Sequence, residues 1–146
     1  MVGQTAKERL VGSWTLVSLT AGEGADQSLP YGPSPKGSMM VDANGRFMIT
    51  VVRSDLPNFA SNNRMRGTPD ENNSVVQGSI AYYGTYTVDA ARRTVIHHVE
   101  ASLYPNWVGT EQRRLFEFSE GKLILRAANG SGGPGTEGRL VWERVK

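Results

Sequence analysis

The sequence predicts an all-β domain, an eight-stranded antiparallel up-and-down β-barrel with a short helix in the long loop after the third strand. Apolar and polar residues alternate with a period of two along most of the chain, and turn-forming residues interrupt the alternation about every 8–12 residues. The 146 residues suffice for one domain, 1–146, and contain no internal repeat. Eight neighbouring strands close naturally into a barrel, which removes exposed strand edges and leaves room inside for one small ligand.

Each predicted strand is a run of alternating residues between turn signals. In chain order, the eight runs cover residues 12–20, 36–42, 46–53, 80–88, 94–103, 110–119, 122–128 and 139–145. The strongest local signal is the turn Ala43–Gly45, because Asn-Gly between alternating runs favours a hairpin, and both of these residues tolerate a positive φ angle. In the first run, Trp14 and Leu16 are expected on one face, with Val17 and Leu19 on the other.

Two loops stand out between these runs. Residues 54–78 are polar and lack strand alternation, but the sequence from Thr68 to Glu71 has a hydroxyl cap, a proline and two acids, the features of a helix start. We therefore predict one short helix there, and a loop of this length favours a functional role such as a lid over the barrel mouth. Residues 129–138 are rich in glycine and predict a flexible loop.

Composition narrows the classes of function. The chain has no cysteine, which excludes disulfides, thiolate metal sites and cysteine nucleophiles. It has no apolar run of the ~20 residues that span a membrane, and its first residues lack the pattern of a signal peptide. We therefore expect a cytoplasmic protein with no membrane partner. The net charge of +2 comes from scattered arginines, so no nucleic-acid partner is expected, although an anionic small molecule is compatible with it.

The stretch Thr94–Gly109 holds both histidines of the chain, side by side in a predicted strand. Because successive side chains of a strand point to opposite faces, only one of His97 and His98 can face the interior. The more apolar of the two faces is the one that carries Val95, His97, Val99, Ala101 and Leu103. We therefore place His97 inside, as the polar group of an otherwise apolar face.

Pairing with the preceding strand suggests a role for this histidine. Simple pairing across the intervening turn places Tyr86 opposite His97, and it places Tyr82 opposite Ala101 as a ligand contact. A Tyr–His pair in an apolar lumen could bind a carbonyl or a phenol, or act catalytically by transferring a proton near neutral pH. The alternative is a buried histidine that is bonded to Tyr86 or to the backbone, without turnover.

A slip of one residue in this pairing would reverse the faces. His98 and Glu100 would then face the lumen together, as an imidazole oriented by a carboxylate and thus as the catalytic pair. Without the slip, they form a solvated pair on the exterior.

Two further segments supply candidate ligand-binding residues. Tyr104–Trp107 either walls the pocket mouth, with flat apolar area from Trp107 and an orienting amide from Asn106, or forms a simple turn. On the next strand, the aromatic face is expected inside, and this face carries Gln112, Arg114, Phe116 and Phe118. An inward Arg114 could pair with a ligand carboxylate or enolate, whereas an outward one would be an ordinary surface charge.

No cofactor and no metal are expected. The chain has no glycine-rich phosphate loop between a strand and a helix. His97 and His98 lie on opposite faces and cannot readily share one metal ion. Ser102 has no suitably placed base, so a hydrolase triad is not expected.

Several short motifs, taken in order, resemble a known family. Gly12-Ser13-Trp14 opens the first strand and Trp142-Glu143-Arg144 closes the last, similar to the lipocalin, or calycin, signature, in which a basic side chain packs across the tryptophan at the closed end. The wider set of motifs is Leu10–Trp14, Pro35–Gly37, Gly84–Tyr86, His97–Glu100, Pro105–Thr110 and Leu140–Arg144. Together they resemble the bacterial and fungal lipocalin-like domain proteins, mostly of unassigned function. The resemblance implies an eight-stranded barrel with a cavity, a fold that hosts carriers and occasional enzymes.

Three hypotheses of function follow. The leading one is a barrel that binds a small, mostly apolar molecule with a polar or ionisable group. The alternative is a cofactor-free isomerase or cyclase of a metabolic intermediate, with His97 and Tyr86 as acid and base and Arg114 or Asn106 stabilising negative charge. The third is an interaction module whose loop 54–78 contacts a protein partner. The sequence does not indicate an oligomeric state.

Overall fold

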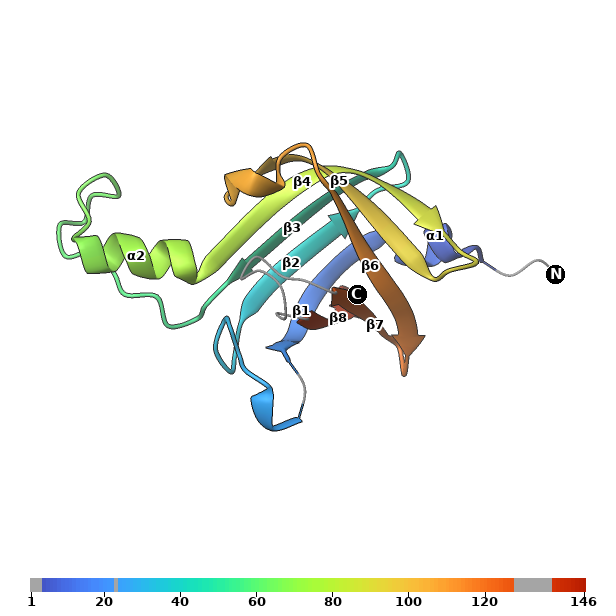
Figure 1. Ribbon diagram of the computed structural model, residues 1–146, viewed down its shortest axis with the longest axis horizontal. Coiled ribbons are helices and arrows are strands. Elements are labelled where there is room, and N and C mark those ends of the chain that lie inside the picture. The colour runs from blue at the N-terminus through green and yellow to red at the C-terminus, as the bar shows by residue number, and fades with distance from the viewer. Residues whose placement is uncertain (1–3, 23, 128–137) are drawn as a thin grey trace.

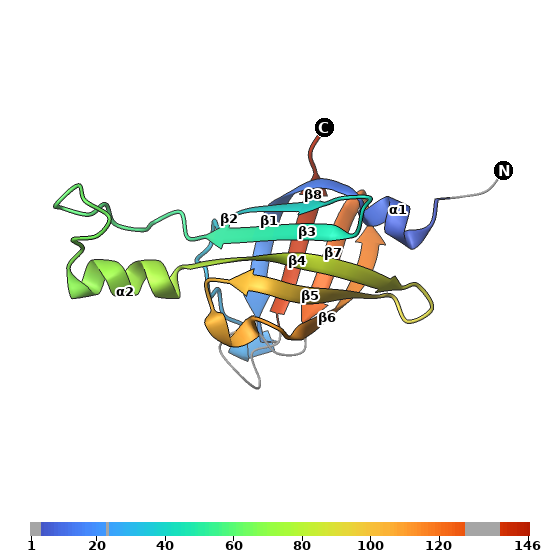
Figure 2. The ribbon, with the colours of Figure 1, turned by 90° about the horizontal axis from the view of Figure 1, so that it is seen from above.

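Eight antiparallel strands form a closed barrel, as the sequence predicts (Figures 1 and 2). The computed structural model describes residues 4–22, 24–127 and 138–146. The strands are β1 Gly12–Ala21, β2 Lys36–Val41, β3 Arg46–Val52, β4 Ser79–Asp89, β5 Thr94–Ser102, β6 Glu111–Ser119, β7 Lys122–Ala127 and β8 Gly138–Arg144. Each strand pairs with the next one along the chain, and β8 closes the barrel against β1. Their bounds differ from the predicted ones by at most one residue.

In the described part of the chain, four short helical segments accompany the strands. They are α1 Ala6–Leu10, α2 Pro69–Gln77 and two 3-10 turns, η1 Gly24–Asp26 and η2 Pro105–Trp107. Among the described residues, no helix is both long and apolar enough to cross a membrane. The glycine-rich loop predicted at 129–138 lies outside the described residues, except for Gly138.

The two ends of the barrel differ in their connections. At one end, which we call the closed end, short turns join β2 to β3, β4 to β5 and β6 to β7. At the other end, which we call the open end, the longer segments 22–35, 53–78 and 103–110 join β1 to β2, β3 to β4 and β5 to β6. Successive strands of the barrel run in opposite directions, and therefore all these longer segments gather at one rim.

The predicted Asn-Gly hairpin is the turn between β2 and β3. Its Gly45 has a φ of 90°, whereas Asn44 is not in the positive-φ region. The Asp42 carboxylate accepts the backbone N–H groups of Asn44 and Arg46 at 2.9 and 2.8 Å. The hairpin is confirmed, and only Gly45 uses the positive φ that both residues tolerate, because a three-residue loop needs one residue in the left-handed conformation.

A β-bulge in β1 changes one predicted face. The pairing of β1 with β8 shifts between Leu16 and Ser18. As a result, Leu19 is buried in the core on the same side as Leu16, whereas simple alternation placed it on the other face with Val17. Val17 is exposed, as that alternation requires.

A second bulge lies between Tyr83 and Gly84, where the pairing of β4 with β5 shifts by one residue. Tyr82 therefore pairs with Ser102, and the predicted pairing of Tyr82 with Ala101 is wrong. The extra residue of this bulge, Glu100, lies in β5, so the alternation along β4 is unbroken and the Tyr82 side chain still points inside.

The short helix predicted in the long loop is α2, and it begins as expected. Thr68 Oγ1 accepts the Glu71 N–H at 3.1 Å, and the Glu71 carboxylate accepts the Thr68 N–H at 2.8 Å, which is a capping box. The helix has no buried residue and extends outward from the barrel beyond the open end (Figure 2). It does not cover the mouth, so the predicted lid is not found, although its last turn, Val75–Gln77, lines the cavity rim.

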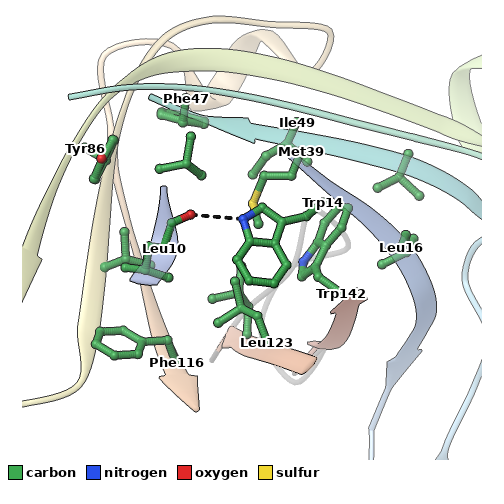
Figure 3. Close-up of a cluster of buried hydrophobic side chains, with 14 of the residues drawn as sticks. Leu10, Trp14, Leu16, Met39, Phe47, Ile49, Tyr86, Phe116, Leu123 and Trp142 are labelled. Carbon is green, nitrogen blue, oxygen red and sulfur yellow. Dashed lines mark hydrogen bonds between the residues drawn. The ribbon is translucent and has the colours of Figure 1, made fainter. Parts of the chain in front are cut away.

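Two tryptophans and their apolar neighbours fill the closed end (Figure 3). Trp14 Nε1 donates to the Leu10 carbonyl of α1 at 2.9 Å, and the Arg144 guanidinium lies 4.2 Å from the centre of a Trp14 ring. The guanidinium also donates to the carbonyls of Val11 and Arg9 at 2.8 and 2.6 Å. The closed end thus has the tryptophan plug and covering cation that the family resemblance implies.

Candidate functional site

A large cavity occupies the open half of the barrel. Its volume is about 640 Å³, and its walls are mainly aliphatic and aromatic side chains from β1 and from β3 to β8. The aromatic members of this wall are Tyr31, Tyr82, Tyr104 and Trp107. Largely apolar cavities of this size, with a small number of polar groups, are typical of small-molecule sites.

His97 faces the interior, as the sequence predicts. It is 2% exposed, its ring centre lies 4.2 Å from that of Phe47, and it sits where the cavity meets the closed-end core. Its Nδ1 has no hydrogen-bond partner among the described residues. Burial, together with the positive charges of Arg114 and His98, lowers the pKa of His97 to about 3. The imidazole is therefore neutral near physiological pH, with one N–H donor and one acceptor nitrogen.

The lowered pKa of His97 predicts that the fold loses stability in acid. The imidazole takes up a proton near pH 6.5 in the unfolded chain but at about pH 3 in the folded one. Between these two pH values, the unfolded state therefore binds more protons than the folded state. Its contribution is complete above about pH 6.5 and decreases as the pH falls. We expect a loss of about 2 kcal/mol in the free energy of unfolding between neutral pH and about pH 5, measured by urea unfolding.

His97→Gln should lose much less stability over the same interval, since it has no imidazole to protonate. His98→Gln is the matched control: it removes the neighbouring imidazole on the outer face and retains His97. The pKa assignment would be contradicted by an acid-dependent loss of equal size in His97→Gln and in the unmodified protein.

Arg114 is the second buried polar side chain. It points inward from β6, is 6% exposed and lines the cavity. Its Nη1 donates to the Arg113 carbonyl at 3.1 Å, its Nη2 donates to Gln112 Oε1 at 3.3 Å, and its Cζ lies 5.9 Å from the centre of a Trp107 ring. No aspartate or glutamate in the described part of the chain forms an ion pair with it. His97 and Arg114 are the buried polar or charged residues of this part, and both line the cavity.

An aromatic cluster forms part of the cavity wall toward the mouth. Trp107 lies edge-to-face with Tyr82 at a centre-to-centre distance of 5.0 Å and with Tyr104 at 5.8 Å. These three side chains come from β4, from η2 and from the residue that precedes it. The predicted placement of Tyr82 and Trp107 at the cavity agrees with the structure.

Tyr86 is paired with His97 on the adjacent strand, as expected, but its hydroxyl is used elsewhere. It donates to the Asp42 carbonyl at 2.6 Å, and its ring lies in the closed-end core (Figure 3). Burial raises the pKa of the Tyr86 hydroxyl, and the Asp42 charge raises it further. Tyr86 does not line the large cavity, so the structure does not bring a Tyr–His pair together there.

His98 and Glu100 lie on the outer face, so the slipped register is not the one found. His98 Nδ1 is 3.5 Å from a Glu111 carboxylate oxygen, and Glu100 forms an ion pair with Arg46 at 2.9 Å. Hydrogen bonding to Arg46 lowers the pKa of the Glu100 carboxyl. Neither residue lines the cavity, because β5 presents Val95, His97 and Val99 to the interior instead.

Three other predicted ligand contacts do not line the cavity. Asn106 is exposed, because successive residues of a 3-10 turn point in different directions and Trp107 takes the inward one. Gln112 faces inward but bonds to Arg114 and supports it. Phe116 is buried in the closed-end core, two residues deeper along β6 than Arg114 (Figure 3).

Comparison with known proteins identifies the family. A family model described as "Lipocalin-like domain" matches residues 11–145. The chain belongs to the lipocalin-like domain family. A fungal protein of similar sequence is the 4'-hydroxy-3'-methoxypropiophenone carrier protein ppsC of Aspergillus oryzae. It is 32% identical to this chain over 103 residues, which cover 65% of this chain and 93% of the fungal protein.

This lipocalin-like barrel also has cavity residues that sequence reasoning missed. Tyr31 lies in the segment between β1 and β2, and Val75 and Val76 lie in the last turn of α2. Tyr31 could have been noticed as an aromatic residue in a loop otherwise rich in Gly, Pro and Ser. The two valines carry no signal, since aliphatic residues at helix ends are common, whereas Leu103 was on the face predicted to point inward. Among the described residues of this lipocalin-like domain, no cluster of three or more potential metal ligands is present.

Proposed function

We propose that this protein binds one small, mostly apolar molecule with a polar or ionisable group, and holds it in the barrel cavity. The observation that carries the proposal is a cavity of about 640 Å³ whose buried polar side chains are His97 and Arg114. The apolar walls would supply affinity through buried area. The two polar side chains would select the ligand's polar group and fix its orientation.

The fungal relative supports binding without turnover. Its name states that it is a carrier of 4'-hydroxy-3'-methoxypropiophenone, and it matches this chain over 93% of its own length. A carrier needs the cavity and its mouth but no acid–base pair. The isomerase or cyclase alternative is favoured less, because it needs Tyr86 beside the substrate and the Tyr86 hydroxyl already donates to the Asp42 carbonyl.

Native mass spectrometry of the purified protein tests the proposal directly. We expect a small organic molecule that stays bound under native conditions and is released on unfolding. If the protein carries none and also fails to bind uncharged apolar fluorescent probes such as N-phenylnaphthylamine, the proposal is wrong.

Trp107→Ala should weaken the binding of N-phenylnaphthylamine by about tenfold, because it removes a flat aromatic contact from the cavity wall. Fluorescence titration measures the change. Tyr83→Ala is the matched control, since Tyr83 is an aromatic residue of β4 that points outward and is 41% exposed. Equal losses in the two variants would argue against binding inside the barrel.

A further inference from the structure

Arg114 brings a positive charge into the barrel that no described residue neutralises. Its guanidinium is always ionised, and it is 6% exposed. Its hydrogen bonds to the Arg113 carbonyl and the Gln112 amide go to uncharged oxygens. Removal of a cation from water without an opposite charge is costly, and such a cost is typical of a functional site. The Arg114 side chain borders the cavity.

The guanidinium is also held in place. Gln112 Nε2 donates to Thr110 Oγ1 at 2.8 Å, and Gln112 Oε1 accepts from Arg114. These two hydrogen bonds link the guanidinium through Gln112 to Thr110 and restrict its orientation. The centre of a Trp107 ring lies 5.9 Å from Cζ of Arg114, at the outer limit of a cation–π contact. A planar guanidinium that is fixed in this way matches the two oxygens of a carboxylate, which it binds through parallel N–H donors.

Arg114 is the group suited to pair with a carboxylate when it is compared with the other described titratable groups that border the cavity. They are His97 from β5, Tyr82 from β4, Tyr104 next to η2 and Tyr31 from the segment after β1. His97 carries no charge near neutral pH, since burial lowers its pKa, but its unpartnered Nδ1 can take part in one hydrogen bond. No acidic side chain is among the described residues that line the cavity.

We propose that the cavity takes its ligand as an anion, a mostly apolar molecule whose single carboxylate pairs with Arg114 while its apolar body lies along the aromatic wall of Tyr82, Tyr104 and Trp107. This inference rests on the proposed function, and it narrows the ligand's polar group to a carboxylate. His97 supplies a second, uncharged contact at the inner end of the cavity.

Two competitors that differ in charge but hardly in shape test the proposal. N-phenylnaphthylamine, which is uncharged, is bound first as a fluorescent reporter. It is then displaced by naphthaleneacetate or by naphthaleneacetamide. The unmodified protein should bind the carboxylate at least about tenfold more tightly than the amide, because a charge-assisted pair in a low-dielectric cavity is stronger than a neutral hydrogen bond.

Three variants test whether Arg114 is responsible for the preference for the carboxylate over the amide. Arg114→Gln should remove it, and Arg114→Lys should retain part of it. Arg113→Gln is the matched control, since it deletes the same charge from the adjacent, outward-facing position and should keep the full preference. The reporter's own affinity should change by less than about threefold in Arg113→Gln, because the reporter carries no charge.

The failures of the two proposals are distinguishable. If the reporter binds but the unmodified protein does not prefer the carboxylate, or if the preference survives Arg114→Gln, the anion inference is wrong and the proposed function stands. If the reporter does not bind and native mass spectrometry finds no bound small molecule, both are wrong. The comparison in the unmodified protein decides the inference even if Arg114→Gln fails to fold.

Discussion

Trp14→Ala should lower the free energy of unfolding by about 3–5 kcal/mol, the range for a fully buried aromatic side chain. The loss has three sources. The substitution leaves a cavity in the closed-end core, removes the hydrogen bond to the Leu10 carbonyl, and removes the ring against which Arg144 packs. Because the plug also anchors α1, we expect α1 to lose its protection from hydrogen exchange as well. Urea unfolding and amide exchange measure the two effects.

Trp14→Phe is the informative control. It retains an aromatic ring in the plug and removes the indole N–H, so it should cost clearly less than the alanine variant. The cost should lie within about 1–3 kcal/mol. If alanine and phenylalanine were equally destabilising, the burial of the ring would not be the main source of the plug's stability.

Gly84→Ala should destabilise the fold by about 3 kcal/mol although it adds only one methyl group. Gly84 lies at the bulge between β4 and β5, and a Cβ there would overlap the His98 carbonyl oxygen and crowd the Glu100 backbone nitrogen. Both obstacles are backbone atoms of β5, which cannot move without a change in the strand that carries His97. Urea unfolding gives the loss of stability.

Gly138→Ala supplies the comparison for Gly84→Ala, since it is also a strand glycine. A Cβ at Gly138 would meet only ordinary contacts, the Leu140 side chain at 3.8 Å and the Thr20 carbonyl at 3.9 Å. Its stability should therefore change by less than about 1 kcal/mol. A Gly84→Ala variant as stable as Gly138→Ala would mean that β5 can shift away from β4 at the bulge.

The strands of this protein could be predicted because their signals are local. Alternation and turn residues lie within each strand and its flanks, and the capping residues Thr68 and Glu71 are within one helical turn. The two bulges could not be predicted in this way. They depend on which residue of one strand opposes which residue of the next, and this is decided when the barrel closes.

The sequence predicted which side chains point into the barrel, but not how far from the open end each of them lies. The alternation of apolar and polar residues correctly predicted that His97 and Arg114 point inward. It could not tell that Phe116, on the same face as Arg114, lies about 7 Å deeper along the strand and so joins the closed-end core. It also could not foresee that the Tyr86 hydroxyl would bond to the Asp42 carbonyl, a contact between residues 44 positions apart.

The concentration of the long segments at one rim has a consequence for how such barrels diverge. The tryptophan plug and the short turns stand at the opposite rim, so insertions and deletions near α2 or η2 alter what enters the mouth without disturbing the elements that hold the strands together. Changes in these segments should therefore affect access to the cavity more than the stability of the barrel. Relatives can be expected to vary in the length of these segments while they keep the plug.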